Sequence, residues 1–597
     1  MKRSQATNEY KWDFSHLYKN QNQWKQDLDR LISLSKEYEK FKGNLNKKEV
    51  FFKSIELDEE IGLIANKLSI YTRMGDTDQT NEVYRTLEGL LINALQEIYT
   101  LTAFVNPELK QIGQETIFSW LKEDQKYQKY EYGFKKFFEQ AKHVLDQHDE
   151  ELLSKVSKSR GAISMMYDTL AYADRQDQKI NYKDQEQVLT NSLLAEISQD
   201  SDPIKDQQLR LKATKLFSKN FSDRKHSFAQ IYEGILQADF ESVKLRNYQS
   251  SLQSSLSSDS VDTSIYLKLL EVGKKYIKPL QDYLLLIKQT FKLEKFYPSD
   301  RQLKLVKDYN RSFTVDQAKE IIRKALKVLG DQYLEKLEIA WSANRIDYYE
   351  DTNKRDGAYS TGGHGIEPIV LMNWDNKLSS VNTLAHECGH SVHTLFADES
   401  QPYPLSEYPI ILAEVASTIN EHLLFDFMFN NAQTKEEKIY LLQQRLFDLT
   451  STFYRQIQFA DFEYRASQLV EKQIPFTAEL LNNLFTEVQN DYGYTVFDKI
   501  EQEDQKQGFG WPRISHFFHS PFYVYKYAID VTASFKLYDD IKKGNIDSTL
   551  NFLKAGGHKE PLKIMLDAGI DFTKEETYQP LINGIINYTN QLKELLK

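Results

Sequence analysis

The sequence predicts a mainly α-helical protein. Gly (23) and Pro (13) are scarce among 597 residues, whereas Leu, Lys, Glu, Gln and Ala, which favour helix over strand, dominate long stretches. From Trp24 to about Thr190, amphipathic helical patterns such as Glu59–Tyr71 and Val83–Phe104 follow one another, joined by short polar turns. A chain of this length exceeds a single small core, so we expect two or more lobes.

A turn signal at Ser201-Asp202-Pro203 marks the expected edge of the first lobe, because the residue before a Pro is biased away from the helix. We place the boundary near residue 195, which gives a helical N-terminal lobe of residues 1–195 and a second domain of residues 196–597. The Ser-rich piece Ser250–Ser260 predicts an exposed connection between helices.

Charge and composition exclude several classes of partner. The net charge of −11 and the lack of a concentrated Lys/Arg block argue against a nucleic-acid surface. The first residues carry no apolar stretch of a signal peptide, and no 18-residue apolar run follows, so we expect no membrane partner. The single cysteine, Cys388, excludes an internal disulfide and fits a reducing compartment. We expect a cytoplasmic protein, a monomer or weak oligomer.

The stretch His386-Glu387-Cys388-Gly389-His390 has the pattern H-E-x-x-H, which predicts a zinc site if the residues from Ser380 to Phe396 are helical. His386 and His390 would then be neighbours four residues apart, with Cβ atoms about 5–6 Å from one another on one face. Glu387 would project roughly 100° around the helix, where it can reach a water at the metal and act as general base. The alternative is a buried helix with core histidines.

A catalytic zinc site usually takes three protein ligands, so one more is needed. The metzincin pattern would require a His where this chain has Phe396, which excludes that class. The predicted helix Ile410–Phe427 supplies Glu414 and Glu421, seven residues and two turns apart on one face. One of them would bind the metal and the other could orient a histidine.

The residues before this helix pair combine a glycine-dense segment, 356–365, with a strand candidate, Ile369–Asn373. We expect the glycine-dense segment to be a mobile loop. A strand beside the metal helix suits peptide binding, because an extended substrate can add to a sheet edge by main-chain hydrogen bonds. The alternative is that this strand is part of a core sheet.

These motifs resemble those of a known family. The run T-L-A-H-E-x-G-H-S-V-H, followed by A-E-V-A-S-T-x-N-E so that Glu414 falls 24 residues after His390, resembles oligoendopeptidase F, a bacterial branch of the thimet-oligopeptidase-like zinc metallopeptidases. The likeness spans nearly the whole chain, since further stretches look like landmarks of that family: Trp12-Asp13-Phe14-Ser15, Gly357-Ala358-Tyr359-Ser360, Asn373-Trp374 and His516 to Tyr527.

The resemblance implies a zinc-dependent endopeptidase that hydrolyses internal bonds of short peptides. It assigns one zinc ion per chain to His386, His390 and Glu414, the general base to Glu387, and the orientation of a ligand imidazole to Glu421. The implied fold is a helical N-terminal lobe over a helical, zincin-type catalytic lobe with a small β-sheet, with a deep substrate channel between the two lobes.

The segment Ser515–Tyr527 resembles the His/Tyr stretch that faces the zinc in this family. His516 and Tyr523 are the first choices for stabilising the oxyanion, and Gly508-Phe509-Gly510 would let the segment close over substrate. The resemblance also implies a set of substrate-binding residues: Gly357, Tyr359, Tyr525 and Tyr527.

Two positions depart from the family pattern. Cys388 stands where an apolar residue such as Leu is usual, and we interpret it as a small buried hydrophobe rather than a redox switch. Phe518 stands where a Tyr is common. Two other functions stay open: a zinc exopeptidase, for which no unambiguous anchor for a terminal charge is present, and a peptide-binding protein with an idle zinc site, which would have no use for Glu387.

Overall fold

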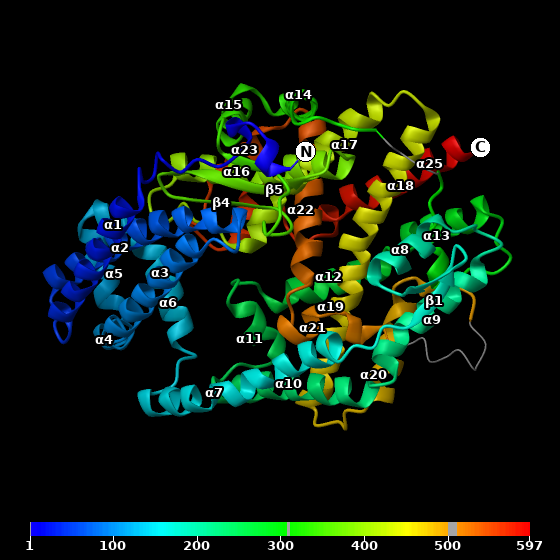
Figure 1. Ribbon diagram of the computed structural model, residues 1–597. Coiled ribbons are helices and arrows are strands. Elements are labelled where there is room, and N and C mark those ends of the chain that lie inside the picture. The colour runs from blue at the N-terminus through cyan, green and yellow to red at the C-terminus, as the bar shows by residue number, and fades with distance from the viewer. Residues whose placement is uncertain (1, 307–310, 500–509) are drawn as a thin grey trace. The chain divides into compact units, whose positions relative to one another are not determined.

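The structure is a computed structural model that describes residues 2–306, 311–499 and 510–597 (Figure 1). The chain divides into two compact units. The first unit comprises residues 1–142, 310–427 and 537–569, and the second comprises residues 143–309, 428–536 and 570–597. The described residues are mainly helical with small sheets, which confirms the predicted fold class.

The first unit combines an N-terminal group of helices with a three-stranded sheet and the helices around it. The helices α1, α2 and α3 pack side by side, as Figure 1 shows in blue. The bounds are α1 Gln21–Glu37, α2 Lys48–Thr72, α3 Glu82–Leu101, α4 Val105–Ile112, α5 Gln114–Glu123, α6 Glu131–Ala141, α14 Val315–Leu326, α15 Asp331–Ala340, β3 Ile346–Tyr349, β4 Tyr359–Gly363, β5 Ile366–Trp374, α16 Leu378–Ser400, α23 Asp547–Lys554 and α24 Pro561–Asp567.

This division differs from the expected boundary near residue 195, and the core of the first unit gives the reason. Trp12, Phe14 and the buried faces of α1 to α3 form one apolar cluster with Ile366, Ile369 and Leu371 of β5. The backbone N–H of Trp12 also donates to Asp347 of β3 at 3.1 Å. A compact unit is formed by segments whose side chains share one core, even when they are far apart in the sequence. The N-terminal helices therefore group with the sheet that precedes the metal motif.

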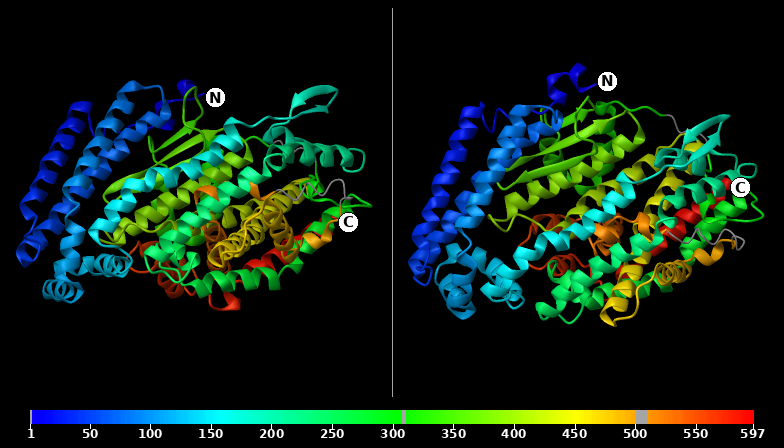
Figure 2. Two further views of the ribbon diagram at one scale, coloured as in Figure 1. Left: turned by 90° about the horizontal axis from the view of Figure 1, so that it is seen from below. Right: turned by 60° about the horizontal axis from the view of Figure 1, so that its bottom comes forward.

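The sheet has the order β3-β5-β4, with β3 parallel and β4 antiparallel to β5, and α16 packs on β4 and β5 (Figure 2, right). The predicted strand is confirmed and extends over Ile366–Trp374. It is central and paired on both sides, so the expectation that it offers a free edge is wrong. The two edge strands are β3 on one side of β5 and β4 on the other. The segment predicted as a mobile loop contains this strand, and a Cβ at Gly363 would lie 1.6 Å from Nδ2 of Asn66, so glycine permits close packing on α2.

The second unit is a helical assembly with one β-hairpin among its described residues, in which β1 pairs antiparallel with β2. Its bounds are α7 Gln147–Asp168, β1 Lys179–Tyr182, β2 Gln185–Val188, α8 Asn191–Asp200, α9 Gln207–Ser222, α10 Lys225–Leu245, α11 Ser251–Ser257, α12 Thr263–Lys275, α13 Lys278–Thr290, α18 Lys435–Thr452, α19 Tyr454–Glu471, α20 Ala478–Asp491, α21 His516–His519 and α25 Gln579–Leu596.

Two helices continue from one unit into the other: α17 Ile410–Asn430 and α22 Tyr525–Lys542. The expected turn at Ser201–Pro203 lies between α8 and α9 and is confirmed. The expected loop at Ser250–Ser260 is wrong, because its centre forms α11. Ser250 caps this helix by accepting from the N–H of Gln253, and its two leucines are buried.

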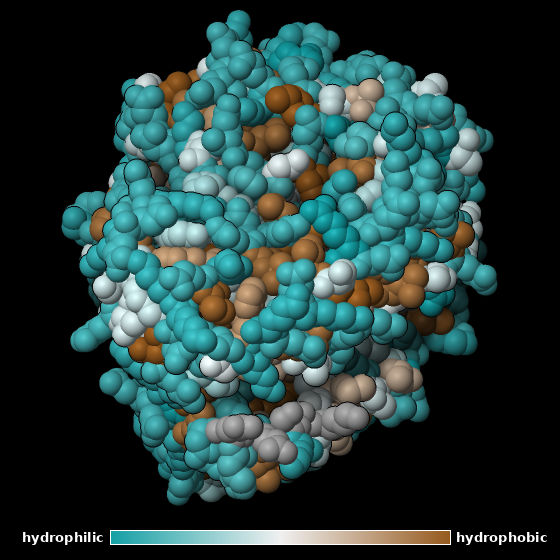
Figure 3. All heavy atoms as spheres, turned by 90° about the vertical axis from the view of Figure 1, so that its left-hand side faces the viewer, coloured by the Kyte–Doolittle hydropathy of each residue, from teal (hydrophilic) through white to brown (hydrophobic). Residues whose placement is uncertain are grey.

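The surface is largely hydrophilic on the face shown in Figure 3, with apolar side chains visible in hollows between polar ones. Within the described part of the chain, no helix combines the length and apolar character that crossing a membrane requires.

Candidate metal centre

The metal motif lies where α16 and α17 approach each other very closely. A Cβ added at Gly389 would lie only 2.5 Å from Cα of Ser417 and 3.1 Å from the carbonyl oxygen of Ala416. Gly389 is therefore the residue of the H-E-x-x-H motif that lets the two helix backbones touch. The contact brings the face of α16 that carries both histidines next to the face of α17 that carries Glu414 and Glu421.

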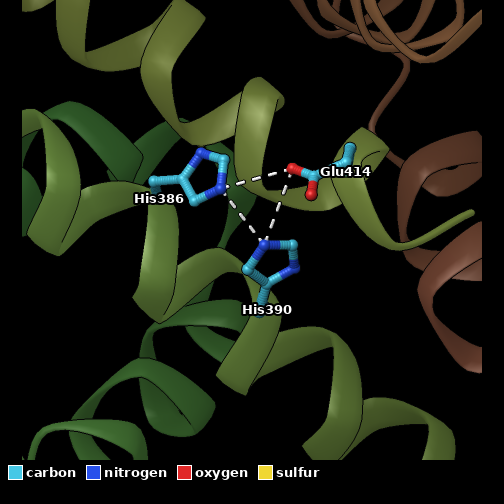
Figure 4. A group of neighbouring side chains, drawn as sticks. All are labelled: His386, His390 and Glu414. Carbon is cyan, nitrogen blue, oxygen red and sulfur yellow. Dashed lines mark hydrogen bonds and ion pairs between the residues drawn. The ribbon is translucent and has the colours of Figure 1, made fainter. Parts of the chain in front are cut away.

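Three donor atoms converge at this crossing (Figure 4). The Nε2 atoms of His386 and His390 lie 3.2 Å apart, and Oε2 of Glu414 lies 3.3 Å from the first and 3.7 Å from the second. The ring planes of the two histidines are inclined by 81°. Two imidazole nitrogens and one carboxylate oxygen that point at one spot form a donor set suited to a zinc ion with an open position.

Hydrogen bonds fix the donors from behind. Glu421 places Oε1 2.6 Å from Nδ1 of His386, and the backbone of Ala413 bonds the ring of His390. Asn420, next to Glu421, donates from Nδ2 to the carbonyl oxygen of Ala385 at 2.9 Å and so ties α17 to α16. With Nδ1 of His386 bonded to Glu421, its Nε2 is left to face the other two donors.

Burial and mutual charge separate the pKa values of these groups. Burial alone would raise the pKa of Glu414, but the hydrogen bond from His386 and the charges of both histidines hold it lowered to about 2. Burial tends to lower the pKa of His386, yet Glu414 and Glu421 raise it well above its usual value. Burial and the neighbouring His386 lower the pKa of His390 to about 4. The two carboxylates therefore favour a positive charge at His386, whereas His390 favours its neutral form.

Glu387 lies beside the donors with its side chain buried, at 7% exposure. Burial raises the pKa of its carboxyl to about 7, against the lowering effect of His386 and of a hydrogen bond from the backbone of Ser360. Ser360 belongs to the edge strand β4, so this bond brings the strand edge next to the carboxylate. A carboxyl whose pKa is close to neutrality can both take up and release a proton.

A support that the sequence did not indicate lies behind His390. The ring of His393 stacks on Tyr408 with 3.7 Å between centroids, and the Tyr408 hydroxyl donates to the carbonyl oxygen of His390 at 3.3 Å. His393 is buried and Tyr408 is half-buried. Cys388 is buried as well, as predicted, and burial raises the pKa of its thiol to about 12.

Two of the expected substrate-binding residues lie around β4. Gly357 has a φ of +81° with no atom within 4 Å of an added Cβ, and its carbonyl oxygen accepts from Nδ2 of Asn373 at 2.9 Å. Tyr359 begins β4 and donates its hydroxyl to Asp76 at 2.6 Å. The hydroxyl of Tyr359 is thus engaged within the protein, and its role in substrate binding stays a prediction.

Three residues of the His/Tyr segment, His516, Tyr523 and Tyr527, lie next to one another in the second unit. The rings of His516 and Tyr523 stack at 6.0 Å, and the Tyr527 hydroxyl lies 3.4 Å from Nε2 of His516. Tyr525 does not join them. Its side chain is fully buried with the hydroxyl 3.4 Å from Asp259, so its prediction as a substrate contact is not supported and packing accounts for it.

Phe518 and His519, which lie in the same segment, contact side chains of α7. Phe518, which replaces the usual Tyr, is buried and stacks on Tyr167 at 4.0 Å. His519 bonds Asp168 through Nε2 at 2.9 Å. Gly508 and Phe509, expected to let the segment close, lie outside the described residues.

Comparison with known proteins decides the family. The sequence model of peptidase family M3 matches residues 203–583, and that of the oligopeptidase F N-terminal region matches residues 108–176. The chain belongs to peptidase family M3. As a family M3 member it is an enzyme, a metallopeptidase, and the recognition of an oligoendopeptidase F relative from the sequence is confirmed.

Individual relatives match over most or all of their length. Oligopeptidase PepF of Bacillus subtilis is 28% identical over 600 residues, covering 100% of this chain and 88% of the relative. The oligoendopeptidase F homolog of Borreliella burgdorferi is 29% identical over 605 residues, covering 100% of both. A crystal structure of a peptidase from Chlamydophila abortus superposes with a TM-score of 0.91 at 28% identity, covering 100% of this chain and 99% of that one.

Proposed function

We propose that this metallopeptidase is a zinc-dependent endopeptidase that hydrolyses internal bonds of short peptides. The observation that carries the proposal is the convergence of His386, His390 and Glu414, whose donor atoms all lie within 4.8 Å of one another. Lone pairs that face each other this closely repel unless a proton or a metal ion lies among them, and a set of two nitrogens with one oxygen fits zinc.

One zinc ion per chain would be held by these three side chains, and Glu421 would keep His386 in the tautomer that presents Nε2. A bound zinc ion would polarise a water molecule and the scissile carbonyl. Glu387 then accepts a proton from the attacking water while the water oxygen bonds to the carbonyl carbon. Glu387 delivers that proton to the amine nitrogen as the C–N bond breaks. The pKa of Glu387, about 7, suits both steps near neutral pH.

Peptide substrates are supported by the place of β4. This edge strand offers main-chain hydrogen-bonding groups, and its Ser360 bonds Glu387 directly. A peptide that added to such an edge would be gripped through its backbone regardless of sequence. The relatives named oligopeptidase and oligoendopeptidase support short substrates, which we expect to span roughly 5–20 residues.

Stabilisation of the oxyanion by His516 and Tyr523 stays a prediction, as does the channel between the lobes. Loss of one oxyanion donor typically costs roughly 10²–10³ in rate. We expect Tyr523→Phe and His516→Ala to lower kcat far more than they raise KM, with metal content unchanged. Tyr525→Phe is the matched control, because its hydroxyl is buried against Asp259. Wild-type kinetics in both test variants would remove the two residues from the mechanism.

The proposed activity is tested with internally quenched decapeptides whose ends are free or blocked, with and without a chelator, alongside metal analysis of the purified protein. We expect cleavage of both peptides at internal bonds, loss of turnover on chelation and recovery with Zn²⁺. Cleavage that requires a free end would identify an exopeptidase. Zinc binding without turnover of either peptide would identify a binding protein.

A further inference from the structure

A pocket of about 720 Å³ opens within the first unit among the N-terminal helices. Its walls come from α2, α3, α4 and α6 and from the loop Tyr403–Leu405. Among the described residues that line it, none belongs to α16 or α17, so its lining shares no residue with the metal centre. Its volume falls in the range of about 300–1,000 Å³ that is usual for small-molecule sites.

Aromatic rings make up much of the wall. The negative face of such a ring attracts a cation, and the attraction grows where water is excluded. Eight aromatic side chains line the pocket: Tyr38, Phe51, Tyr99, Tyr130, Tyr132, Phe134, Phe137 and Tyr403. None of the described lining residues is a Lys, Arg or His.

Two neighbouring carboxylates in the lining differ in their partners. Glu59 is neutralised by Lys129, whose Nζ lies 2.7 Å from Oε2. Asp58 accepts a hydrogen bond from the Tyr38 hydroxyl at 3.2 Å and has no cationic partner in the described part of the chain. The Asp58 side chain stays open to solvent inside the pocket. A single unpaired negative charge thus lies within an aromatic wall.

The wall around Asp58 is tightly built. A Cβ at Gly62, one turn further along α2, would lie 2.1 Å from Oη of Tyr403, so this glycine makes room for the ring. The loop that carries Tyr403 is held by the N–H of Gly557, which donates to the carbonyl oxygen of Leu405 at 2.8 Å.

We propose that this pocket is a binding site for an organic cation on an apolar stem, an alkylguanidinium or alkylammonium group. The charged head would pair with Asp58, and the stem would pack on the rings. The same chemistry occurs in a free small amine or guanidine and in the Arg or Lys side chain of a peptide. This proposal does not depend on the peptidase activity.

The test uses n-butylguanidinium and N-butylurea, which share shape and differ in charge, with binding to the full chain followed by ligand-observed NMR. We expect the cation to bind and the urea to bind at least about tenfold more weakly. Asp58→Asn should weaken binding of the cation roughly 10- to 100-fold and leave the affinity for the urea unchanged. Glu97→Gln, an exposed acid of α3 outside the lining, is the matched control and should change neither.

A second variant keeps the test decisive if Asp58→Asn fails to fold. Tyr99 is 78% exposed at the pocket, so Tyr99→Ala removes a ring without opening the core, and it should weaken the cation by roughly 2- to 5-fold. Equal binding of both probes to the wild type would overturn the proposal, as would unchanged affinity for the cation in the folded variants. Competition by a blocked Ala-Arg-Ala peptide, but not by its citrulline counterpart, would identify peptide side chains as the source. Failure of both peptides to compete would identify free small cations.

Discussion

Gly389→Ala tests whether the close crossing of α16 and α17 builds the metal centre. The added Cβ would meet backbone atoms at 2.5 Å (Ser417 Cα), 3.0 Å (Ser417 N) and 3.1 Å (Ala416 O). Carbon atoms in contact lie about 3.5–4.0 Å apart, so α17 must withdraw by roughly 1 Å or more. Backbone atoms cannot rotate away as a flexible side chain would.

Such a shift would separate the two sets of metal-binding side chains, because Glu414 lies one turn before Ser417. Misplacement of about 1 Å at a reacting centre can cost roughly 10²-fold in rate, and overpacking costs about 1–3 kcal/mol of stability. We therefore expect Gly389→Ala to bind less metal and to lose about 100-fold in kcat/KM, while the fold survives with a lowered Tm.

The assay combines metal analysis, peptide turnover and thermal unfolding on one preparation. Gly89→Ala is the matched control, since Gly89 lies inside α3 with nothing within 4 Å of an added Cβ. Alanine there should keep full activity and add up to about 1 kcal/mol of stability. Wild-type metal content and turnover in Gly389→Ala would refute the reasoning.

Three further predictions concern single carboxylates. Glu387→Gln should keep its metal and lose at least about 10²-fold in turnover, and metal analysis with kinetics would contradict this if turnover stays within about tenfold of wild type. Glu414→Ala should lose more metal than Glu421→Ala, for which roughly a 10–100-fold weakening is expected; the reverse order would exchange their roles. Glu463 is buried and its pKa is raised to about 8. The protonated form is favoured in the folded state, so its contribution to stability is full below pH 4.5 and is lost as pH rises toward 8. Denaturant unfolding should show that the free energy of unfolding of Glu463→Gln, relative to that of the wild type, is higher at pH 8 than at pH 5. The same difference at both pH values would contradict a raised pKa of Glu463.

Local patterns predicted much of the metal centre. His386 and His390 share a helix face because they are four residues apart, a relation that needs no other part of the chain. The bounds of α16 contain the predicted helix, and Glu414 and Glu421 lie on one face of the next helix as their spacing indicated. The scarcity of Gly and Pro likewise predicted a mainly helical fold, since helix preference sums over each segment.

Other features depended on contacts between distant segments. The spacing along α17 did not distinguish whether Glu414 or Glu421 binds the metal. Only the helix crossing at Gly389 places Glu414 near Nε2 and Glu421 near Nδ1 of His386. The apolar run Ile369–Asn373 predicted a strand, but its central place in the sheet required β3 and β4 on either side.

The sequence by itself thus determined which side chains carry the chemistry and how they are spaced within each helix, because helical geometry is local. Tertiary structure decided that the N-terminal helices share a core with β5, that Tyr525 is buried while the rings of Tyr523 and Tyr527 pack against His516, and that Asp58 lies among aromatic rings. Burial and the pairing of charges depend on which distant segments meet, and a one-dimensional pattern does not record those contacts.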